Sequence, residues 1–274
     1  MKMKQITFFE IDSPLLNYLT NVTSQCGEDG VIHRINELMP PKHRYCVEFG
    51  AWDGKRFSNC HNLLANAGWS GLMIEADPVK FQDLMKTFGD NDRVVKMNRF
   101  VGFEGEDRLD SLLLEAGAPE DFDILSIDID GCDYYVWESL RYFSPSLVII
   151  EFNPSVPNDV IFVQDRTFEV NQGCSLLALI ELGKQKGYEL ICATPFNGFF
   201  VKKDDYPRFS IPSNFIGHLY RPMHDGRIFQ GFDSTIHVVG MEKLQWHQSA
   251  APLSSEDFQV LPKSLRRWGD AKRG

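Results

Sequence analysis

The feature that most constrains this chain is a regular alternation of two kinds of segment from Cys46 to Asn153. Short apolar runs, bounded by glycine, proline or acidic residues, are each followed by a segment with apolar residues at helical spacing. The short runs suit buried strands, and the other segments suit helices packed on them. Strands that alternate with helices build a mainly parallel sheet with helices on both faces and right-handed crossovers. We therefore expect an α/β fold whose ligand site lies beyond the carboxyl ends of the strands.

The last two expected strands break this pattern. Only Pro195-Phe-Asn-Gly198 separates residues 188–194 from residues 199–203, and a link of four residues cannot carry a parallel crossover. These strands should form an antiparallel hairpin. The prediction is a doubly wound, seven-stranded, mainly parallel sheet with an antiparallel hairpin at its edge. Strands are expected from 46 into the following turn and at 71–77, 94–101, 122–128, 146–153, 188–194 and 199–203, with helices at 31–39, 58–67, 79–88, 109–113, 134–143 and 175–186.

The domain organisation follows from length and composition. A chain of 274 residues, 43% of them hydrophobic, can bury a full core, which fits one main domain. We expect that domain at 24–203, preceded by an N-terminal segment or lid at 1–23. Residues 204–274 form a C-terminal extension with little periodicity, expected to cover an acceptor site or to make an oligomer contact. Whether the chain forms a homo-oligomer therefore stays open.

Charge and cysteine content narrow the classes of partner. The formal net charge of −10 would repel a polyanion, so we expect no nucleic-acid partner. No apolar run reaches bilayer length, so we expect no membrane partner. The six cysteines are scattered without metal-binding spacing, which indicates reduced packing residues and a cytoplasmic protein.

The turn after the first strand, Cys46-Val-Glu-Phe-Gly-Ala-Trp-Asp-Gly54, predicts the kind of ligand. A dinucleotide-binding turn needs three closely spaced glycines so that a pyrophosphate can approach the backbone. This turn has only Gly50 and Gly54, and Glu48, Trp52 and Asp53 add bulk and negative charge. A ligand with a cationic centre fits better than a phosphate.

The second strand ends at Glu75, where a carboxylate can accept both hydroxyls of a ribose. A nucleoside without phosphates and with a cationic centre describes S-adenosylmethionine. The alternative is structural: Glu48 and Asp53 would cap a helix or pair with Lys55 and Arg56. The strand pattern and Glu75 together favour the cofactor.

Five segments in this order resemble the class I S-adenosylmethionine-dependent methyltransferases, and within them the FkbM-like family. The segments are Ser24-Gln-Cys-Gly-Glu-Asp-Gly30, Glu48-Phe-Gly-Ala-Trp-Asp-Gly54, Ile74-Glu-Ala-Asp77, Ser126-Ile-Asp-Ile-Asp-Gly131 and Asn197-Gly-Phe-Phe-Val201. The resemblance implies a Rossmann-like fold and methyl transfer to a hydroxyl of a sugar, a polyketide or another small metabolite. The expected cofactor-binding residues are Glu48, Gly50, Asp53, Gly54, Asn59, Glu75, Ala76, Asp110 and Asp128.

Methyl transfer needs an aligned acceptor and a group that takes its proton. Asp128 and Asp130 follow the fourth strand, and Glu151 and Asn153 end the fifth, so these four are the expected catalytic residues. Oxygen ligands of this kind also suit Mg²⁺ or another divalent cation, and the same four residues are the candidate metal ligands. Two alternatives stay open: Asp128 or Asp130 acts as a direct base, or Asp130-Gly131 is a simple turn with Asp133 as a helix cap.

Other residues carry less weight. His218, His224 and His237 have the right pKa range for a base but stand in a region without a predicted role. Tyr134, Tyr135 and Trp137 could line an acceptor pocket or pack in the core. Two other functions remain as alternatives: a catalytically inactive nucleoside-binding partner in a biosynthetic complex, and a nicotinamide-dependent oxidoreductase.

Overall fold

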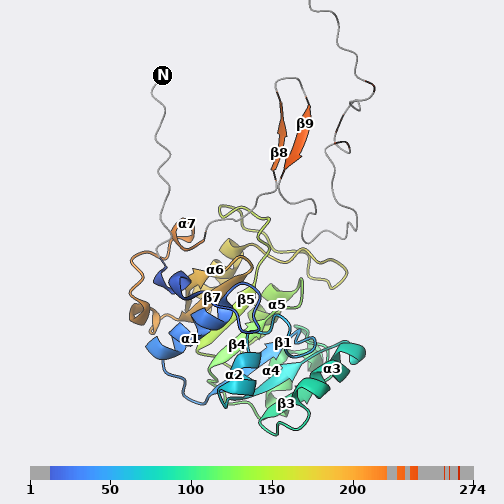
Figure 1. Ribbon diagram of the computed structural model, residues 1–274, viewed down its shortest axis with the longest axis vertical. Coiled ribbons are helices and arrows are strands. Elements are labelled where there is room, and N and C mark those ends of the chain that lie inside the picture. Colours follow the sequence, from blue (N-terminus) through green and yellow to red (C-terminus); the bar gives the residue numbers. More distant parts are fainter. Residues whose placement is uncertain are drawn as a thin grey trace, which may run out of the picture. The chain divides into compact units, whose positions relative to one another are not determined.

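A computed structural model describes residues 13–220, 227–231 and 235–239, together with 256, 259 and 265. The chain divides into two compact units, residues 1–222 and residues 223–274. Figure 1 shows the elements in chain order. In the described part of the chain, no helix is both long and apolar enough to cross a bilayer.

The first unit contains strands and helices in the predicted alternation. Its strands are β1 (Tyr45–Phe49), β2 (Ser70–Ile74), β3 (Val94–Met97), β4 (Ile124–Ile127), β5 (Leu147–Glu151), β6 (Tyr188–Ala193) and β7 (Asn197–Lys202). Its α-helices are α1 (Glu28–Leu38), α2 (His61–Asn66), α3 (Pro78–Phe88), α4 (Leu109–Glu115), α5 (Asp133–Ser139), α6 (Leu176–Gln185) and α7 (Ile216–Leu219). Short 3-10 helices cover Pro14–Tyr18, Gly105–Asp107 and Tyr206–Phe209.

The seven strands form one sheet in the order β3-β2-β1-β4-β5-β7-β6. All neighbouring strands from β3 to β5 pair in parallel, whereas β7 runs antiparallel to both β5 and β6. The predicted fold class, including the antiparallel edge hairpin, is confirmed. The reversed strand itself is β7, which inserts between β5 and the true edge strand β6.

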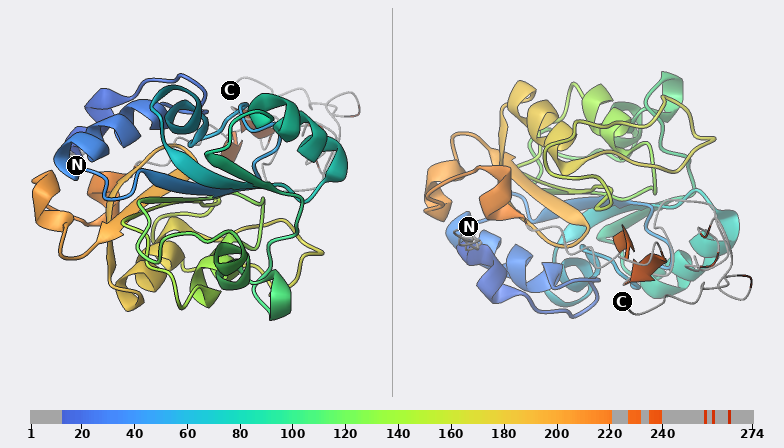
Figure 2. Two further views of the ribbon diagram at one scale, coloured as in Figure 1. Left: turned by 90° about the horizontal axis from the view of Figure 1, so that it is seen from below. Right: turned by 90° about the horizontal axis from the view of Figure 1, so that it is seen from above.

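Helices cover both faces of this sheet. In Figure 2, α1, α2 and α3 lie on one face, and α4, α5 and α6 lie on the other. The central strands are therefore buried on both sides, as their unbroken apolar runs require: every residue of β4 and β5 is buried. Chain order reverses between β1 and β4, so the fold has its switch point there, where a ligand site is expected.

Several boundaries differ from the prediction because loops take over where strands leave the sheet. The third strand was expected to reach Val101 but ends at Met97. The helix expected at 58–67 begins at His61, because residues 50–60 form an extended loop after β1. Glu75, Asp128, Asp130 and Asn153, which were expected at strand ends, therefore lie on loops, whereas Glu151 is the last residue of β5.

The flanking segments also divide differently. In the N-terminal segment, Leu15 is buried and Ser13 Oγ donates a hydrogen bond to the Ile191 carbonyl of β6 at 2.8 Å. Residues 204–220 belong to the first unit, which they join through buried Phe209 and Leu219. The second unit contains an antiparallel pair, β8 (Arg227–Gln230) and β9 (Ile236–Val239). Its basic segment at 266–274 and His224 lie outside the described residues.

Candidate active site

A cavity of about 510 Å³ lies at the switch point of the sheet. It is lined by the carboxyl ends of β1, β2, β4 and β5 and by the loops that follow them. Acidic groups from all four strand ends reach it: Glu48, Glu75, Asp128, Asp130 and Glu151. The volume falls within the range of about 300–1,000 Å³ typical of small-molecule sites. The cavity is thus large enough for a small-molecule ligand and has an acidic floor.

The turn after β1 comes very close to the end of β4. Gly50 has φ +70°, and a Cβ atom on it would lie 1.7 Å from the Asp128 carbonyl oxygen. No residue with a side chain fits this contact. The next residues turn sharply, because Trp52 also has a positive φ of 49°. Gly50 therefore allows the two strand ends to meet below the cavity.

Glu75 is held rigidly at the end of β2. Its Oε2 accepts a hydrogen bond from the Trp52 backbone N–H at 2.8 Å, and its Oε1 accepts one from the Asp77 N–H at 2.8 Å. The side chain is buried apart from the part that lines the cavity with Ala76. Each oxygen keeps a further lone pair, so the carboxylate can still accept hydrogen bonds from a ligand.

Glu48 joins β1 to the loop that follows it. Its carboxylate accepts hydrogen bonds from the Ser58 hydroxyl and, at 2.8 Å, from the Asn59 backbone N–H. Burial raises the pKa of Glu48, while these hydrogen bonds act in the opposite direction. Glu48 therefore fixes the loop and contributes one buried carboxyl to the cavity wall.

Asp128, Asp130 and Glu151 form a cluster whose ligand atoms all lie within 4.8 Å of one another. Burial, and then the nearby charge of Asp133, raises the pKa of Asp128 to about 8. Burial, followed by the charge of Asp128, raises the pKa of Glu151 well above its ordinary value. Two carboxyls this close cannot both be charged at low cost, so the pair binds a proton more tightly than an isolated carboxyl does.

The cluster has one buried oxygen that needs a partner. Glu151 Oε2 has no hydrogen-bond partner among the described residues unless Asp128 or Glu151 carries a proton. A divalent cation would serve the same purpose. Opposite ligands stand about 4.2 Å apart around Mg²⁺ and up to about 5.2 Å apart around Ca²⁺, so this spacing fits a hard cation. Asp128, Asp130 and Glu151 are the residues that would hold it.

Four residues expected at the cofactor, Asp53, Gly54, Asn59 and Asp110, do not line the cavity. Asp53 Oδ1 accepts hydrogen bonds from the backbone N–H groups of Lys55 and Arg56, at 2.9 and 2.7 Å, which is the local turn role of the structural alternative. Gly54 has φ +72° and lies against Leu84. Asn59 donates a hydrogen bond to Ser126 Oγ at 3.1 Å, behind the cavity wall.

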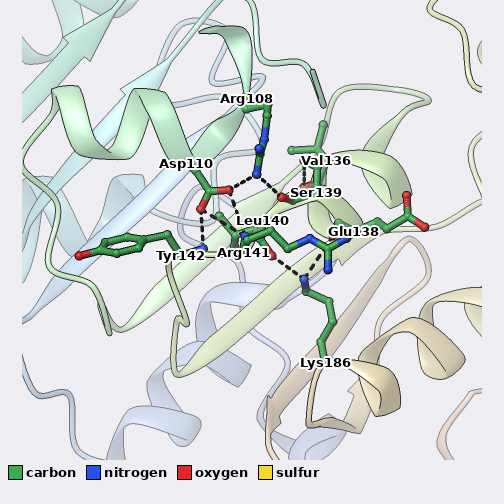
Figure 3. Close-up of polar contacts among 9 residues, drawn as sticks. All are labelled: Arg108, Asp110, Val136, Glu138, Ser139, Leu140, Arg141, Tyr142 and Lys186. Carbon is green, nitrogen blue, oxygen red and sulfur yellow. Dashed lines mark hydrogen bonds and ion pairs between the residues drawn. The ribbon is translucent and has the colours of Figure 1, made fainter. Parts of the chain in front are cut away.

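Asp110 lies in a hydrogen-bond network between α4 and α5. Figure 3 shows its carboxylate between Arg108 and the backbone after α5, where it accepts hydrogen bonds from the N–H groups of Arg141 and Tyr142. Lys186 extends this network by donating to the Leu140 carbonyl at 2.7 Å. Asp110 does not line the cavity. It connects the start of α4 to the end of α5.

Asn153 does not join the acidic cluster. Its Nδ2 donates to the Gln172 carbonyl at 2.7 Å, and its Oδ1 accepts from the Ser155 N–H at 2.9 Å. Asp133 does not line the cavity either; its buried carboxylate accepts the N–H groups of Ile129 and Gly131, both at 2.9 Å. Burial raises the pKa of Asp133 to about 6. These two residues shape the loops that carry the cluster.

The aromatic candidates and His218 do not line the cavity either. Trp137 is a core residue packed against Tyr188 and Phe200. Tyr135 donates its hydroxyl to the Gln164 carbonyl at 2.7 Å. Tyr134 and His218 are not among the residues that line the cavity, and His237 belongs to the second unit.

The sequence analysis did not predict a set of aromatic residues that also line the cavity. Four partly exposed aromatic side chains line it, from Trp52 and Phe57 after β1, Phe100 after β3 and Phe168 after β5. Cations lie over the first two. The Arg56 guanidinium is 4.8 Å from the Trp52 ring centre and 4.9 Å from the Phe57 ring centre, and Lys80 Nζ is 4.9 Å from the Trp52 ring centre. No periodic pattern marks these residues, because they lie on loops.

Gln25 is a further lining residue, from the segment before α1. The segment is held by a buried carboxylate: Asp29 Oδ2 accepts the N–H groups of Val22, Thr23 and Ser24, each at 2.8 Å. Ser24 also pairs with Phe57 in an isolated parallel bridge. The sequence singled out this segment without giving it a role, and the structure places it at the cavity wall.

No family model matches the chain, and a comparison with curated proteins finds no match. Among solved structures, the N-terminal domain of EvdMO1, crystallised in the presence of SAH and D-fucose, is 13% identical over 64% of this chain and 82% of that one, with a TM-score of 0.41. The CMeT domain of the citrinin polyketide synthase is 13% identical over 64% of this chain and 50% of that one, with a TM-score of 0.43.

A third solved structure is the O-methyltransferase NcsB1 from neocarzinostatin biosynthesis, in complex with S-adenosyl-L-homocysteine and 1,4-dihydroxy-2-naphthoic acid. It is 14% identical over 64% of this chain and 57% of that one, with a TM-score of 0.36. The chain thus spans half, or little more, of the length of the second and third structures. Likeness at this level carries no argument about function, which rests on the sheet order and the cavity.

Proposed function

We propose that this chain is an S-adenosylmethionine-dependent methyltransferase that methylates a hydroxyl group of a small molecule. The observation that carries the proposal is the cavity with five acidic groups at the switch point, with Glu75 directly after β2 and with a loop, not a helix, directly after β1. Glu75 suits the ribose hydroxyls, and the acidic floor suits a sulfonium and an ammonium group. The proposed family, FkbM-like, is supported by the sequence motifs alone.

The loop after β1 argues against a nicotinamide dinucleotide. A pyrophosphate binds at the N-terminus of a helix that directly follows the glycine turn. Here α2 does not begin until His61, although β1 ends at Phe49. The carboxylates of Glu48 and Glu75 line the position instead. Two phosphates beside two carboxylates would be strongly unfavourable.

In this proposal, the carboxyl groups of Asp128 and Glu151 accept the proton of the acceptor hydroxyl. Asp128 follows β4, Glu151 ends the adjacent strand β5, and the pKa values of both are raised, so a deprotonated carboxyl in this pair is more basic than an ordinary one. The pair would take the hydroxyl proton as the oxygen attacks the methyl carbon. A cation held by Asp128, Asp130 and Glu151 is the second candidate, and it would instead lower the pKa of the acceptor hydroxyl.

Cofactor binding is the first test. Isothermal titration of the wild-type protein with S-adenosylmethionine and S-adenosylhomocysteine should show binding of both. Glu75→Gln keeps the size of the side chain but removes its charge, and it should raise both dissociation constants about tenfold or more. Asp53→Asn is the matched control on a carboxylate outside the cavity and should change them less than threefold. Wild-type protein that binds neither ligand would refute the proposal.

Turnover separates the proposed enzyme from its alternatives. Methyl transfer to hydroxylated acceptors is measured with EDTA, without additions and with Mg²⁺ or Ca²⁺. Loss of turnover with EDTA and its recovery with a cation supports the metal-assisted route, and turnover in EDTA supports the carboxyl pair. Cofactor binding without turnover of any acceptor supports the inactive partner. Binding of NADH, seen by its fluorescence, would support an oxidoreductase.

A further inference from the structure

The wall of the cavity has a buried acidic part and an exposed basic part. The carboxylates of Glu48, Glu75 and Glu151 are buried, whereas two lining cations, Arg56 and Lys80, are exposed. Arg56 belongs to the loop after β1, and Lys80 stands in the first turn of α3. The acidic floor suits the cationic cofactor of the proposed function, but that cofactor does not account for two cations at the entrance.

One aromatic ring brings the two cations together. The Arg56 guanidinium lies 4.8 Å, and Lys80 Nζ lies 4.9 Å, from the centre of the Trp52 ring, which also lines the cavity. Contact with the face of a ring holds a cation in place and leaves most of its N–H donors free. Two cations on one ring are within a Debye length of each other, about 10 Å at moderate ionic strength, so both act on one nearby anion.

Neither cation has an anionic partner in the described part of the chain. The side chains of Arg56 and Lys80 form no ion pair with any described residue and donate no hydrogen bond to one. The third cation that lines the cavity, Arg99, is different: its Nη1 lies 3.2 Å from Glu115 Oε2, and its Nη2 lies 3.9 Å from Asp107 Oδ1. The protein thus neutralises Arg99 and leaves the other two cations available to a ligand.

The acidic residues close to these cations in the sequence bind backbone groups instead. Asp53 Oδ1 accepts the backbone N–H of Arg56 at 2.7 Å, and Asp77 Oδ1 accepts that of Lys80 at 3.2 Å. Lys80 also stands where a cation is unfavourable, because the first turn of a helix carries a partial positive charge. No ion pair with a described residue therefore explains why these two positions are basic, whereas binding of an anion would explain both.

We infer that Arg56 and Lys80 bind an anionic group, a carboxylate or a phosphate, that the acceptor carries in addition to its reacting hydroxyl. The inference rests on the proposed function. The cofactor, drawn to the buried carboxylates, fills the floor of the cavity, and the acceptor enters over it and reaches the exposed cations. Arginine and lysine are common partners of carboxylates and phosphates, and an arginine can bind either group through two parallel hydrogen bonds.

The cofactor has a carboxylate of its own, but its surroundings differ. That carboxylate is attached to the same carbon atom as the ammonium group, which is drawn to the buried acids of the floor. The acceptor, in contrast, approaches a chain with a formal net charge of −10, which repels an anion at long range. An anionic acceptor therefore needs local cations at the entrance, and Arg56 and Lys80 supply them.

Binding of inorganic phosphate tests the site without knowledge of the acceptor. The full chain, saturated with S-adenosylhomocysteine, is titrated with phosphate at low salt and followed by phosphorus NMR. We expect saturable binding in the millimolar range, about tenfold weaker in Arg56→Gln and in Lys80→Gln. Lys55→Gln is the matched control, at an exposed lysine that does not line the cavity, and should bind phosphate as wild type does. Absence of saturable binding, or equal binding by wild type and every variant, would overturn the inference.

Turnover shows whether the anion belongs to the acceptor. S-adenosylhomocysteine formation is measured with pairs of acceptors that share a hydroxyl and differ in an acidic group: protocatechuate and catechol, and glycerol phosphate and glycerol. We expect kcat/KM to be about tenfold higher for the anionic member of each pair, and this ratio should fall in added salt and in Arg56→Gln. Equal or faster methylation of the uncharged members would overturn the inference and leave the methyltransferase proposal intact. If no acceptor turns over, the phosphate titration decides.

A shortened cofactor separates the acceptor's anion from the cofactor's own carboxylate. Methylthioadenosine has the nucleoside and the sulfur atom of the cofactor but lacks the amino-acid tail. Arg56→Gln should leave the dissociation constants of S-adenosylhomocysteine and of methylthioadenosine within twofold of wild type. If it weakens binding of the first alone, Arg56 binds the cofactor's carboxylate and the inference is wrong. Wild-type protein that binds neither S-adenosylmethionine nor S-adenosylhomocysteine would instead refute the proposed function.

Discussion

The protonation of Asp128 should make folding stability depend on pH in an unusual direction. An isolated aspartate has a pKa of 3.8, and burial in the cluster raises that of Asp128 to about 8. Between these values the folded protein binds the proton and the unfolded chain does not. The stability that this proton provides is fully present below pH 4 and is lost as pH rises to 8.

The size of the effect follows from the same pKa values. The interval of about four units corresponds to about 6 kcal/mol of unfolding free energy at 1.36 kcal/mol per unit. Asp128 lines the cavity and lies close to the ionisable Glu151, so water and this second carboxyl reduce the ceiling, and we expect about 3 kcal/mol. Asp128→Asn cannot lose a proton there, so its stability relative to wild type should rise by about 2 kcal/mol from pH 5 to pH 8.

Urea denaturation followed by circular dichroism at pH 5, 6, 7 and 8 measures this difference. Asp83→Asn, at a carboxyl exposed on α3, is the control, and its stability should run parallel to that of wild type over the whole range. The reasoning is refuted if the Asp128→Asn and wild-type curves also run parallel. It is refuted too if wild type gains stability relative to the variant as pH rises.

Two further substitutions test the structural roles of Gly50 and Asp110. Gly50→Ala places a Cβ 1.7 Å from the Asp128 carbonyl oxygen and should lower the free energy of unfolding by about 4 kcal/mol or more. Gly68→Ala is the control, because Gly68 has φ +72° and no atom within 4 Å of the added Cβ, and it should lower that free energy by only about 1 kcal/mol. Comparable melting temperatures for the two variants would contradict the close approach at Gly50. Asp110→Ala leaves buried N–H groups without an acceptor and should lower the free energy of unfolding in urea by about 2–4 kcal/mol. Titration should find the cofactor dissociation constant within twofold of wild type. A large loss of cofactor affinity would instead show that Asp110 contributes to the cofactor site.

Position at the end of a strand predicts some of the residues that line the cavity but not all of them. Glu75, Asp128 and Glu151 line one cavity because each stands at the end of a buried parallel strand, and such ends meet on one side of a sheet. Asp53 and Asn153 are also polar residues after strands, but their side chains turn back to backbone N–H groups of their own loops. The sequence pattern is the same in both cases, because a carboxylate or amide side chain can face a ligand in the cavity or accept hydrogen bonds from the backbone of its own loop.

The sequence by itself determined the layers, the seven strands and the antiparallel hairpin, because apolar periodicity and a four-residue link leave few arrangements of the backbone. Only the tertiary structure decided which side chains face one another. Phe100 and Phe168 are 68 positions apart on loops without periodicity, yet their rings lie 4.6 Å apart. The raised pKa of Asp128 likewise depends on burial and on neighbouring carboxyls from another strand and from α5, which no local pattern records.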